Sequence, residues 1–340
     1  MTYNFKKKLM TSQINKRNKK AVFDYKAAEE FSLSPSESPI INNSYYFSAH
    51  NEEISIFLRV GNRTSEIETW FVIYYKGQIY SLNRELYPVD DNPIKINLLD
   101  LGDYSISFKG ILNDKDKVDF SSTFKHTQKV INFSTDMPAS RMAVAMANEK
   151  WNKKFFKGLE NISGQTHYEQ EGILEGSFTL NGDKVEFSMP CVRDHSFGKR
   201  DWNYMNNHLW LMAVSPKGQF NYSLVSYPVF SSLEVGNYRQ DNETHFMLSS
   251  NLNYEDINKG EIPHSLSFEI ELDNKEVKKV EVKYLTGVSY RFSNNQYTLH
   301  ENIAEFDIGG EKYRGILEIG FNVDKSRYFN GRNIKEINRK

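Results

Sequence analysis

Alternation of apolar and polar residues dominates this chain. In the stretch DYSISFKGIL, Tyr104, Ile106 and Phe108 alternate with serine and lysine. A period of two is typical of a strand with one buried face. Similar runs, separated by short polar turns, fill residues 44–124 and 167–322, and no helices alternate with them. The pattern predicts antiparallel sheets in a sandwich or barrels, without βαβ units.

One segment departs from the strand pattern. Trp151, Phe155 and Leu159 recur at every fourth position, the spacing of one apolar helix face. We therefore predict an amphipathic helix over residues 138–158. The resulting division has four parts: a basic flexible tail (1–20), an N-terminal β unit (21–135), a helical connector (136–165) and a C-terminal β unit (166–340).

Composition supports the sheets and excludes some partners. Aromatic residues make up 14% of the chain, with 23 Phe and 20 Tyr, and such side chains suit pleated, half-buried surfaces. The 43 basic and 44 acidic residues leave a net charge of −1. Because no overall field attracts polyanions, we expect no nucleic-acid partner.

The chain has a single cysteine and a basic start. Cys191 has no partner for an internal disulfide or a cysteine-based zinc site, and we expect it to be buried and inert. The start, MTYNFKKKLMTSQINKRNKK, lacks the apolar run of a secretory signal, with a targeting segment as the lesser alternative. No run of 18 apolar residues occurs, so we expect no transmembrane segment and a cytoplasmic location.

The least average stretch is CVRDHSFGKRDWNYMNNHLWLMAV, which places many titratable groups beside a strongly apolar strand. It forms either a reactive site or a polar network that joins two parts of the molecule. In an extended segment Arg193 and His195 share one face, and Asp194 and Ser196 the other. This divergence disfavours a Ser-His-Asp triad within the run.

Acid catalysis is the more credible chemistry for this stretch. Burial would raise the pKa of Asp194 and allow it to donate a proton near neutral pH, with His195 as a second candidate. Arg193 and Arg200 would lower the same pKa, and the sequence does not decide between these effects. The alternative is a satisfied polar network without catalytic function.

Metal and cofactor sites are not indicated. His195, His208 and His167 lack the i, i+4 pairing and the cysteine partners of a zinc site. No glycine-rich loop of nucleotide-binding spacing follows a strand. Aromatic residues on the strands, among them Trp70 and Trp210, instead suggest the wall of a small-molecule cavity, although each is also explained as core.

The stretch HYEQEG…LEGSF…NGDKVEFSMPCVRDHSFGKRDW, residues 167–202, resembles the AttH-like and hydroxyneurosporene-synthase-like group. Members carry a Glu-Gln-x-Gly strand followed by Gly-x-Arg-Asp-His-Ser-Trp-Gly-x-Arg-Asp-Trp. Two positions depart from this pattern: Phe197 replaces a Trp, and Cys191 replaces a common Gly. The substrate of any member is therefore not carried over. The matching positions are Glu169, Gln170, Gly172, Arg193, Asp194, His195, Ser196, Gly198, Arg200, Asp201 and Trp202.

The resemblance implies an all-β protein of two lipocalin-like (calycin) antiparallel β-barrels, here joined by the amphipathic helix. Similar proteins include carotenoid hydratases, which add water to an isolated alkene, and more distant enzymes that promote cyclisation of lipophilic polyenes. We therefore expect a cofactor-independent hydratase, isomerase or cyclase acting by acid catalysis on a lipophilic, polyene or terpenoid-like molecule. The alternatives are a carrier of a hydrophobic ligand and a scaffold without a cavity.

The pattern of titratable and aromatic residues and the family resemblance together give the residues expected at the site. The expected catalytic residues are Asp194, His195 and Arg193. The expected substrate-binding residues are Glu169, Ser196, Arg200, Trp202, His208, Trp210 and Trp70. No metal or other cofactor is expected, and the oligomeric state is left open.

Overall fold

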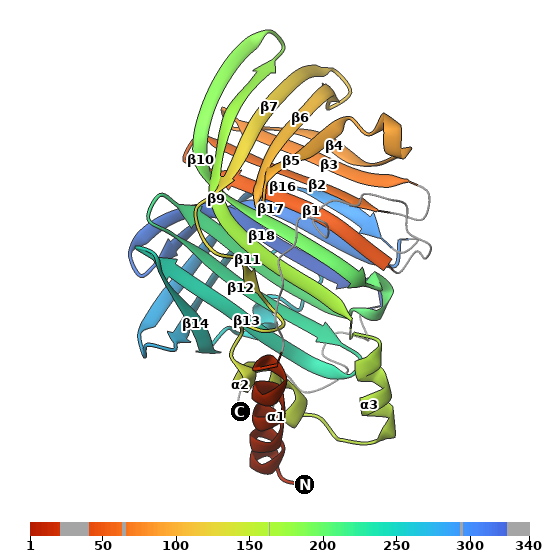
Figure 1. The fold of residues 1–340 in the computed structure, drawn as a ribbon, viewed down its shortest axis with the longest axis vertical. Coiled ribbons are helices and arrows are strands. Elements are labelled where there is room, and N and C mark those ends of the chain that lie inside the picture. Colours follow the sequence, from red (N-terminus) through yellow and green to blue (C-terminus); the bar gives the residue numbers. More distant parts are fainter. Residues whose placement is uncertain (21–40, 63–65, 163, 293–294, 325–340) are drawn as a thin grey trace.

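The computed structural model describes residues 1–20, 41–62, 66–162, 164–292 and 295–324 (Figure 1). Two β units lie one on the other, and the three helices gather at one end of the molecule. Every strand pair is antiparallel, which confirms the predicted fold class. None of the described helices is long and apolar enough to cross a membrane.

The first unit is a ten-stranded sheet around one apolar core. Its hydrogen-bonded path runs β4-β3-β2-β1-β10-β9-β7-β6-β5, with the short β8 pairing β9. This path does not close on itself, whereas the strands of the second unit form a closed barrel. Buried aromatic residues such as Phe71, Phe120 and Phe178 fill the core. The strands are β1 (Ile41–His50), β2 (Ile54–Asn62), β3 (Ile67–Tyr75), β4 (Gln78–Tyr87), β5 (Ile94–Asp100), β6 (Asp103–Leu112), β7 (Asp116–His126), β8 (Ile131–Asn132), β9 (Gln165–Leu180) and β10 (Asp183–Lys199).

The second unit is a closed barrel of eight strands, β11 to β18 in sequence order. Its interior is a packed core that includes Tyr222, Phe268 and Phe306, because alternate residues of each strand point inward. The strands are β11 (Asn207–Ser215), β12 (Gly218–Tyr227), β13 (Phe230–Gln240), β14 (Glu243–Ser250), β15 (Ser265–Leu272), β16 (Val277–Phe292), β17 (Tyr297–Ile308) and β18 (Glu311–Asn322).

Strand pairing corrects the expected boundary at residue 166. Strands β9 and β10 pair with the first sheet, so the first unit extends to Lys199, and the second begins at Asn207. The turn Asn181-Gly182 joins β9 to β10 with positive φ at both residues, as its type requires. Alternation shows that a segment is a strand but not which sheet it joins. The observed boundary between the units therefore lies later in the sequence than the expected one. The central motif thus lies where the chain passes between the units.

The N-terminal segment is a helix rather than the expected flexible tail. Helix α1 (Tyr3–Asn18) packs Met10 and Ile14 against Ala143 of helix α2 (Ala139–Ala147). The Lys6 ammonium donates to the backbone carbonyl of Ala147 at 2.9 Å, which satisfies an end group of α2. Tertiary contact of this kind stabilises helices whose own sequence is only weakly amphipathic.

The predicted connector helix is two short helices. After α2, helix α3 (Lys153–Glu160) begins afresh because the Asn152 side chain accepts a hydrogen bond from the Phe155 amide. Both helices lie between β8 and β9, inside the first unit's sequence, so they do not join the two units. The actual link is the short 3₁₀ helix η2 (Trp202–Tyr204) between β10 and β11; the two other 3₁₀ helices are η1 (Val89–Asp91) and η3 (Tyr254–Asp256).

Candidate functional site

A row of polar and aromatic side chains crosses five neighbouring strands of the first sheet. In register order it consists of Trp70 on β3, Arg59 on β2, Tyr46 on β1, Asp194 on β10 and Glu169 on β9. Directly opposed residues on neighbouring strands share a face, so pairing alone aligns these side chains. The row faces the second unit.

A matching row crosses the outside of the barrel. Ser223, Trp210, Glu318 and Glu301 are register neighbours on β12, β11, β18 and β17. The Trp210 ring meets the Tyr46 ring of the first sheet edge-on, with centroids 5.5 Å apart. The two rows therefore form opposite walls at the interface of the units.

A cavity of about 420 Å³ lies between these walls. Its volume falls within the range of small-molecule sites. Both aromatic and titratable side chains line it, so it can hold an apolar body and also present protons or charges. Among the residues expected from sequence, those that line it are Asp194, Ser196, Arg200, Trp202, His208, Trp210 and Trp70.

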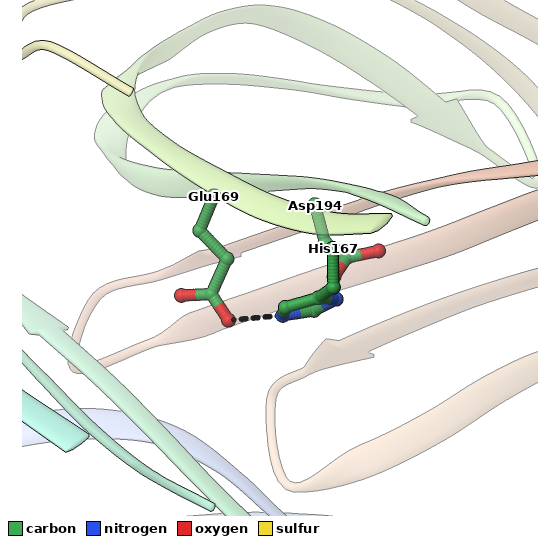
Figure 2. Close-up of side chains that lie close together, drawn as sticks. All are labelled: His167, Glu169 and Asp194. Atoms are coloured by element: carbon green, nitrogen blue, oxygen red, sulfur yellow. Dashed lines mark hydrogen bonds and ion pairs between the residues drawn. The ribbon is translucent and has the colours of Figure 1, made fainter. Parts of the chain in front are cut away.

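His167 is the centre of the polar wall, and Figure 2 shows it between two carboxylates. Its Nδ1 lies 2.7 Å from Asp194 Oδ2 and 2.7 Å from Ser196 Oγ. Its Nε2 lies 3.1 Å from Glu169 Oε1. Glu169 lies behind His167 rather than on the cavity wall, and its other oxygen accepts from the Asn221 amide of the barrel.

The charges of this cluster follow from its geometry. Burial would lower the pKa of His167, but the Asp194 and Glu169 carboxylates together raise it to about 10. Burial raises the pKa of Glu169. For Asp194, burial acts in the same direction, yet the charges of His167, Arg200 and His195 prevail and lower its pKa. At neutral pH the cluster is thus an imidazolium bound to an Asp194 carboxylate.

This charge state predicts a pH dependence of stability. A histidine whose pKa rises on folding stabilises the folded state fully below its unfolded value near 6.5, and this contribution is lost as pH rises through about 10. We expect the free energy of unfolding of wild type, relative to His167→Gln, to fall between these pH values. Urea denaturation of both proteins across this range measures the difference. A constant difference would show that His167 carries no bound proton.

Three ligand atoms of His167, Glu169 and Asp194 lie within 4.8 Å of one another, close enough to hold a metal ion. The two carboxylates, however, bind different ring nitrogens of His167. A metal ion needs the lone pair of one nitrogen with the carboxylates beside it. The arrangement favours a doubly hydrogen-bonded imidazolium.

Arg193 and His195 point to the opposite face of β10, into the first sheet. Arg193 is fully buried and donates to Tyr104 Oη at 3.1 Å and to Gln170 Oε1 at 2.9 Å. The His195 ring stacks on Tyr45, with centroids 4.2 Å apart, and is also fully buried. Neither lines the cavity. Their contacts are those of the polar network considered as the alternative, so their position favours that alternative over the expected catalytic role.

Gly198 sets the path of the motif after β10. Its φ is +102°, and a Cβ there would lie 2.1 Å from the Gly164 carbonyl oxygen. Only glycine allows this bend and close approach. Beyond the bend, the Arg200 guanidinium lies 5.3 Å from the Trp202 ring centroid, and both residues reach the cavity wall.

His208 is the polar centre of the barrel wall. Its Nδ1 is 2.6 Å from Tyr297 Oη, and its Nε2 is 2.5 Å from Glu318 Oε1. Gly320 makes room for it, since a Cβ at that position would lie 2.5 Å from His208 Cε1. Glu301, next to Glu318, is fully buried.

Several site residues were absent from the set expected from sequence. These are His167, Tyr46, Arg59, Glu301 and Glu318. A signal existed for His167, because the alternation of β9 places it on the same face as Glu169. No local signal exists for the others, whose proximity depends on which strands pair and on how the units stack.

Residues 26–323 match the model of a family described as a domain of unknown function, DUF7064. Comparison with curated protein sequences finds no match.

Solved structures share the fold at low sequence identity. A protein described as an AttH from Nitrosomonas europaea is 8% identical, with a TM-score of 0.59 over 86% of this chain and 95% of its own. Kievitone hydratase from Nectria haematococca is 10% identical, with a TM-score of 0.53 over 87% and 97%. These similarities confirm the predicted AttH-like double-lipocalin fold.

Proposed function

This chain belongs to the DUF7064 family, and we propose that it is a hydratase, isomerase or cyclase that acts on a largely apolar small molecule. One observation carries the proposal: a cavity between the units holds the His167 imidazolium, flanked by two carboxylates, beside aromatic walls. Such an arrangement supplies a proton, a group to receive one and a water-poor space.

The proposed roles differ from those expected from sequence. Asp194 remains a carboxylate, so it serves as the base and His167 as the acid. In a hydration, the His167 proton is transferred to one carbon of a double bond and the oxygen of water binds the other. Asp194 takes the proton that the water loses and returns it to His167 across their 2.7 Å contact. Isomerisation and cyclisation need the same proton to be given and recovered.

The aromatic walls suit a largely apolar ligand. Trp70, Trp202 and Trp210 line the cavity and supply apolar surface beside the polar cluster. The pKa of about 10 at His167 matches a double bond activated by a neighbouring polar group better than an isolated alkene, since proton transfer is efficient between groups of similar pKa. A hydratase among the proteins that share this fold supports the reaction class.

A non-catalytic carrier is the second candidate. It is favoured by the hydrogen bonding of His167, because both ring nitrogens are already bound to carboxylates of the protein itself. In that case the cluster only stabilises the interface, and the aromatic walls hold a lipophilic ligand.

Turnover in a lipophilic extract tests the proposal. Wild type should convert a component to a product that is heavier by one water or has the same mass and a different retention time. Ser223→Trp should abolish conversion, because Ser223 lines the cavity. Ser267→Trp, on an exposed position of β15, should not. Chromatography coupled to mass spectrometry measures both.

The same experiment separates the two candidates. A carrier would leave the extract unchanged and retain a ligand in native mass spectrometry, which Ser223→Trp would prevent. Neither conversion nor retention by wild type would refute both functions.

A further inference from the structure

The cavity is lined by several buried polar atoms for which the protein provides no well-formed hydrogen bond. Among the described residues, none makes a hydrogen bond of ordinary geometry with Tyr46 Oη, Trp210 Nε1 or the Glu301 carboxyl oxygens. Tyr46 is 4% exposed and Glu301 0%. A buried polar group without a well-formed hydrogen bond is costly, so three such groups around one cavity call for an explanation.

The three groups are close together. Tyr46 and Trp210 are in edge-on ring contact, and Trp210 lies one strand from Glu318, which in turn lies beside Glu301. Tyr46 and Glu301 approach each other across the interface, and the Tyr46 hydroxyl acts on the Glu301 carboxyl as a hydrogen-bond donor, although not at ordinary geometry. All three line the cavity, together with Asp194. They therefore face one space next to the proposed reaction site.

The neighbouring carboxyl groups of Glu301 and Glu318 differ in their charge. His208 binds Glu318 at 2.5 Å and keeps it ionised. Burial, and next the Glu318 charge, raise the pKa of Glu301 well above its usual value. The protonated, uncharged form of Glu301 is thus favoured beside the Glu318 carboxylate. Its second oxygen remains an acceptor, while Tyr46 and Trp210 are donors.

We propose that Tyr46, Trp210 and Glu301 form a subsite that binds a neutral hydroxyl group of the ligand. The hydroxyl oxygen accepts from Tyr46 or Trp210, and the hydroxyl proton is donated to Glu301. A carboxylate would be repelled by Glu318, and a hydrocarbon would leave all three groups unpaired. The identification of this ligand as a substrate rests on the proposed function. The binding itself does not.

Calorimetric titration with two probes tests the subsite. Geraniol and myrcene are ten-carbon unsaturated molecules with and without a hydroxyl group. Wild type should bind geraniol at least about tenfold more tightly, the worth of one or two buried hydrogen bonds. Glu301→Met removes the acceptor and should weaken geraniol binding about tenfold while changing myrcene binding less than about twofold.

Three further variants complete the test. Glu301→Gln retains an amide donor for Glu318 and an oxygen acceptor, so it should bind geraniol within about threefold of wild type. Tyr46→Phe keeps the ring packing but loses a donor, and it should weaken geraniol selectively, which keeps the proposal testable if Glu301→Met fails to fold. Glu305→Met, at a 46% exposed side chain of the same strand, is the matched control and should have no effect.

Equal binding of the two probes to wild type, or equal weakening of both by Glu301→Met and Tyr46→Phe, would overturn the subsite. Its failure is distinguishable from failure of the enzyme proposal. Selective geraniol binding without any conversion of the extract refutes the enzyme alone. Conversion that coexists with probe binding insensitive to these variants refutes the subsite alone.

Discussion

Replacing Asp194 by asparagine is expected to lower kcat/KM by a factor of about 10² to 10⁴, the usual contribution of acid–base catalysis. The substitution keeps the size of the side chain and removes its negative charge. This charge, on Asp194 Oδ2 at 2.7 Å from His167 Nδ1, keeps His167 protonated. Steady-state kinetics on the compound converted from the extract measures the loss. Asp183→Asn, in the exposed turn at the other end of β10, is the control and should retain wild-type kinetics.

The pH profile distinguishes loss of chemistry from loss of structure. Activity of wild type should fall at alkaline pH as His167 deprotonates near 10. Without the Asp194 charge the pKa of His167 is lower, so the alkaline limb of any residual Asp194→Asn activity should move to lower pH. Weakened binding with an unchanged kcat and an unmoved alkaline limb would contradict a catalytic pair.

Replacing Arg59 by leucine is expected to lower the free energy of unfolding by about 3 to 5 kcal/mol. Arg59 forms an ion pair with Glu68, whose side chain is fully buried. The substitution removes the guanidinium with which this buried carboxylate forms its ion pair. Chemical denaturation followed by far-UV circular dichroism measures the change. Lys109→Leu, in an exposed pair with Asp119 at 3.6 Å, should change stability by less than about 1 kcal/mol.

A double substitution checks the cause. Arg59→Leu combined with Glu68→Leu removes both charges of the pair and should recover much of the lost stability, because the Glu68 carboxylate no longer has to be buried. If the double variant is no more stable than Arg59→Leu alone, the loss comes from packing, such as the Arg59 contact 5.0 Å from the Trp70 ring centroid, and not from the unpaired charge.

Much of the fold follows from local pattern. The alternation within β10 correctly separates the face of Asp194 and Ser196 from that of Arg193 and His195. It does not reveal which face meets the cavity, because that depends on how the sheet is placed against the barrel. The pattern therefore indicates a site around residues 193–202 but includes Arg193 and His195, which the structure buries on the face of β10 away from the cavity.

Other features could not be predicted because they exist only between distant segments. The row from Trp70 to Glu169 needs five strands in one register. Docking of α1 depends on α2, more than 120 residues later, and the charge of His167 depends on a carboxylate of another strand. Each of these residue types is common by itself. Only the pairing of distant segments brings them together into a site.

The bidentate contact between Arg239 of β13 and Glu171 of β9 ties the barrel to the first sheet close to Glu169. Because the two walls of the cavity come from separate units, the shape of the cavity depends on contacts between the units and is a property of neither unit by itself. A substitution that reshapes one wall of the cavity therefore calls for a matching substitution on the wall from the other unit.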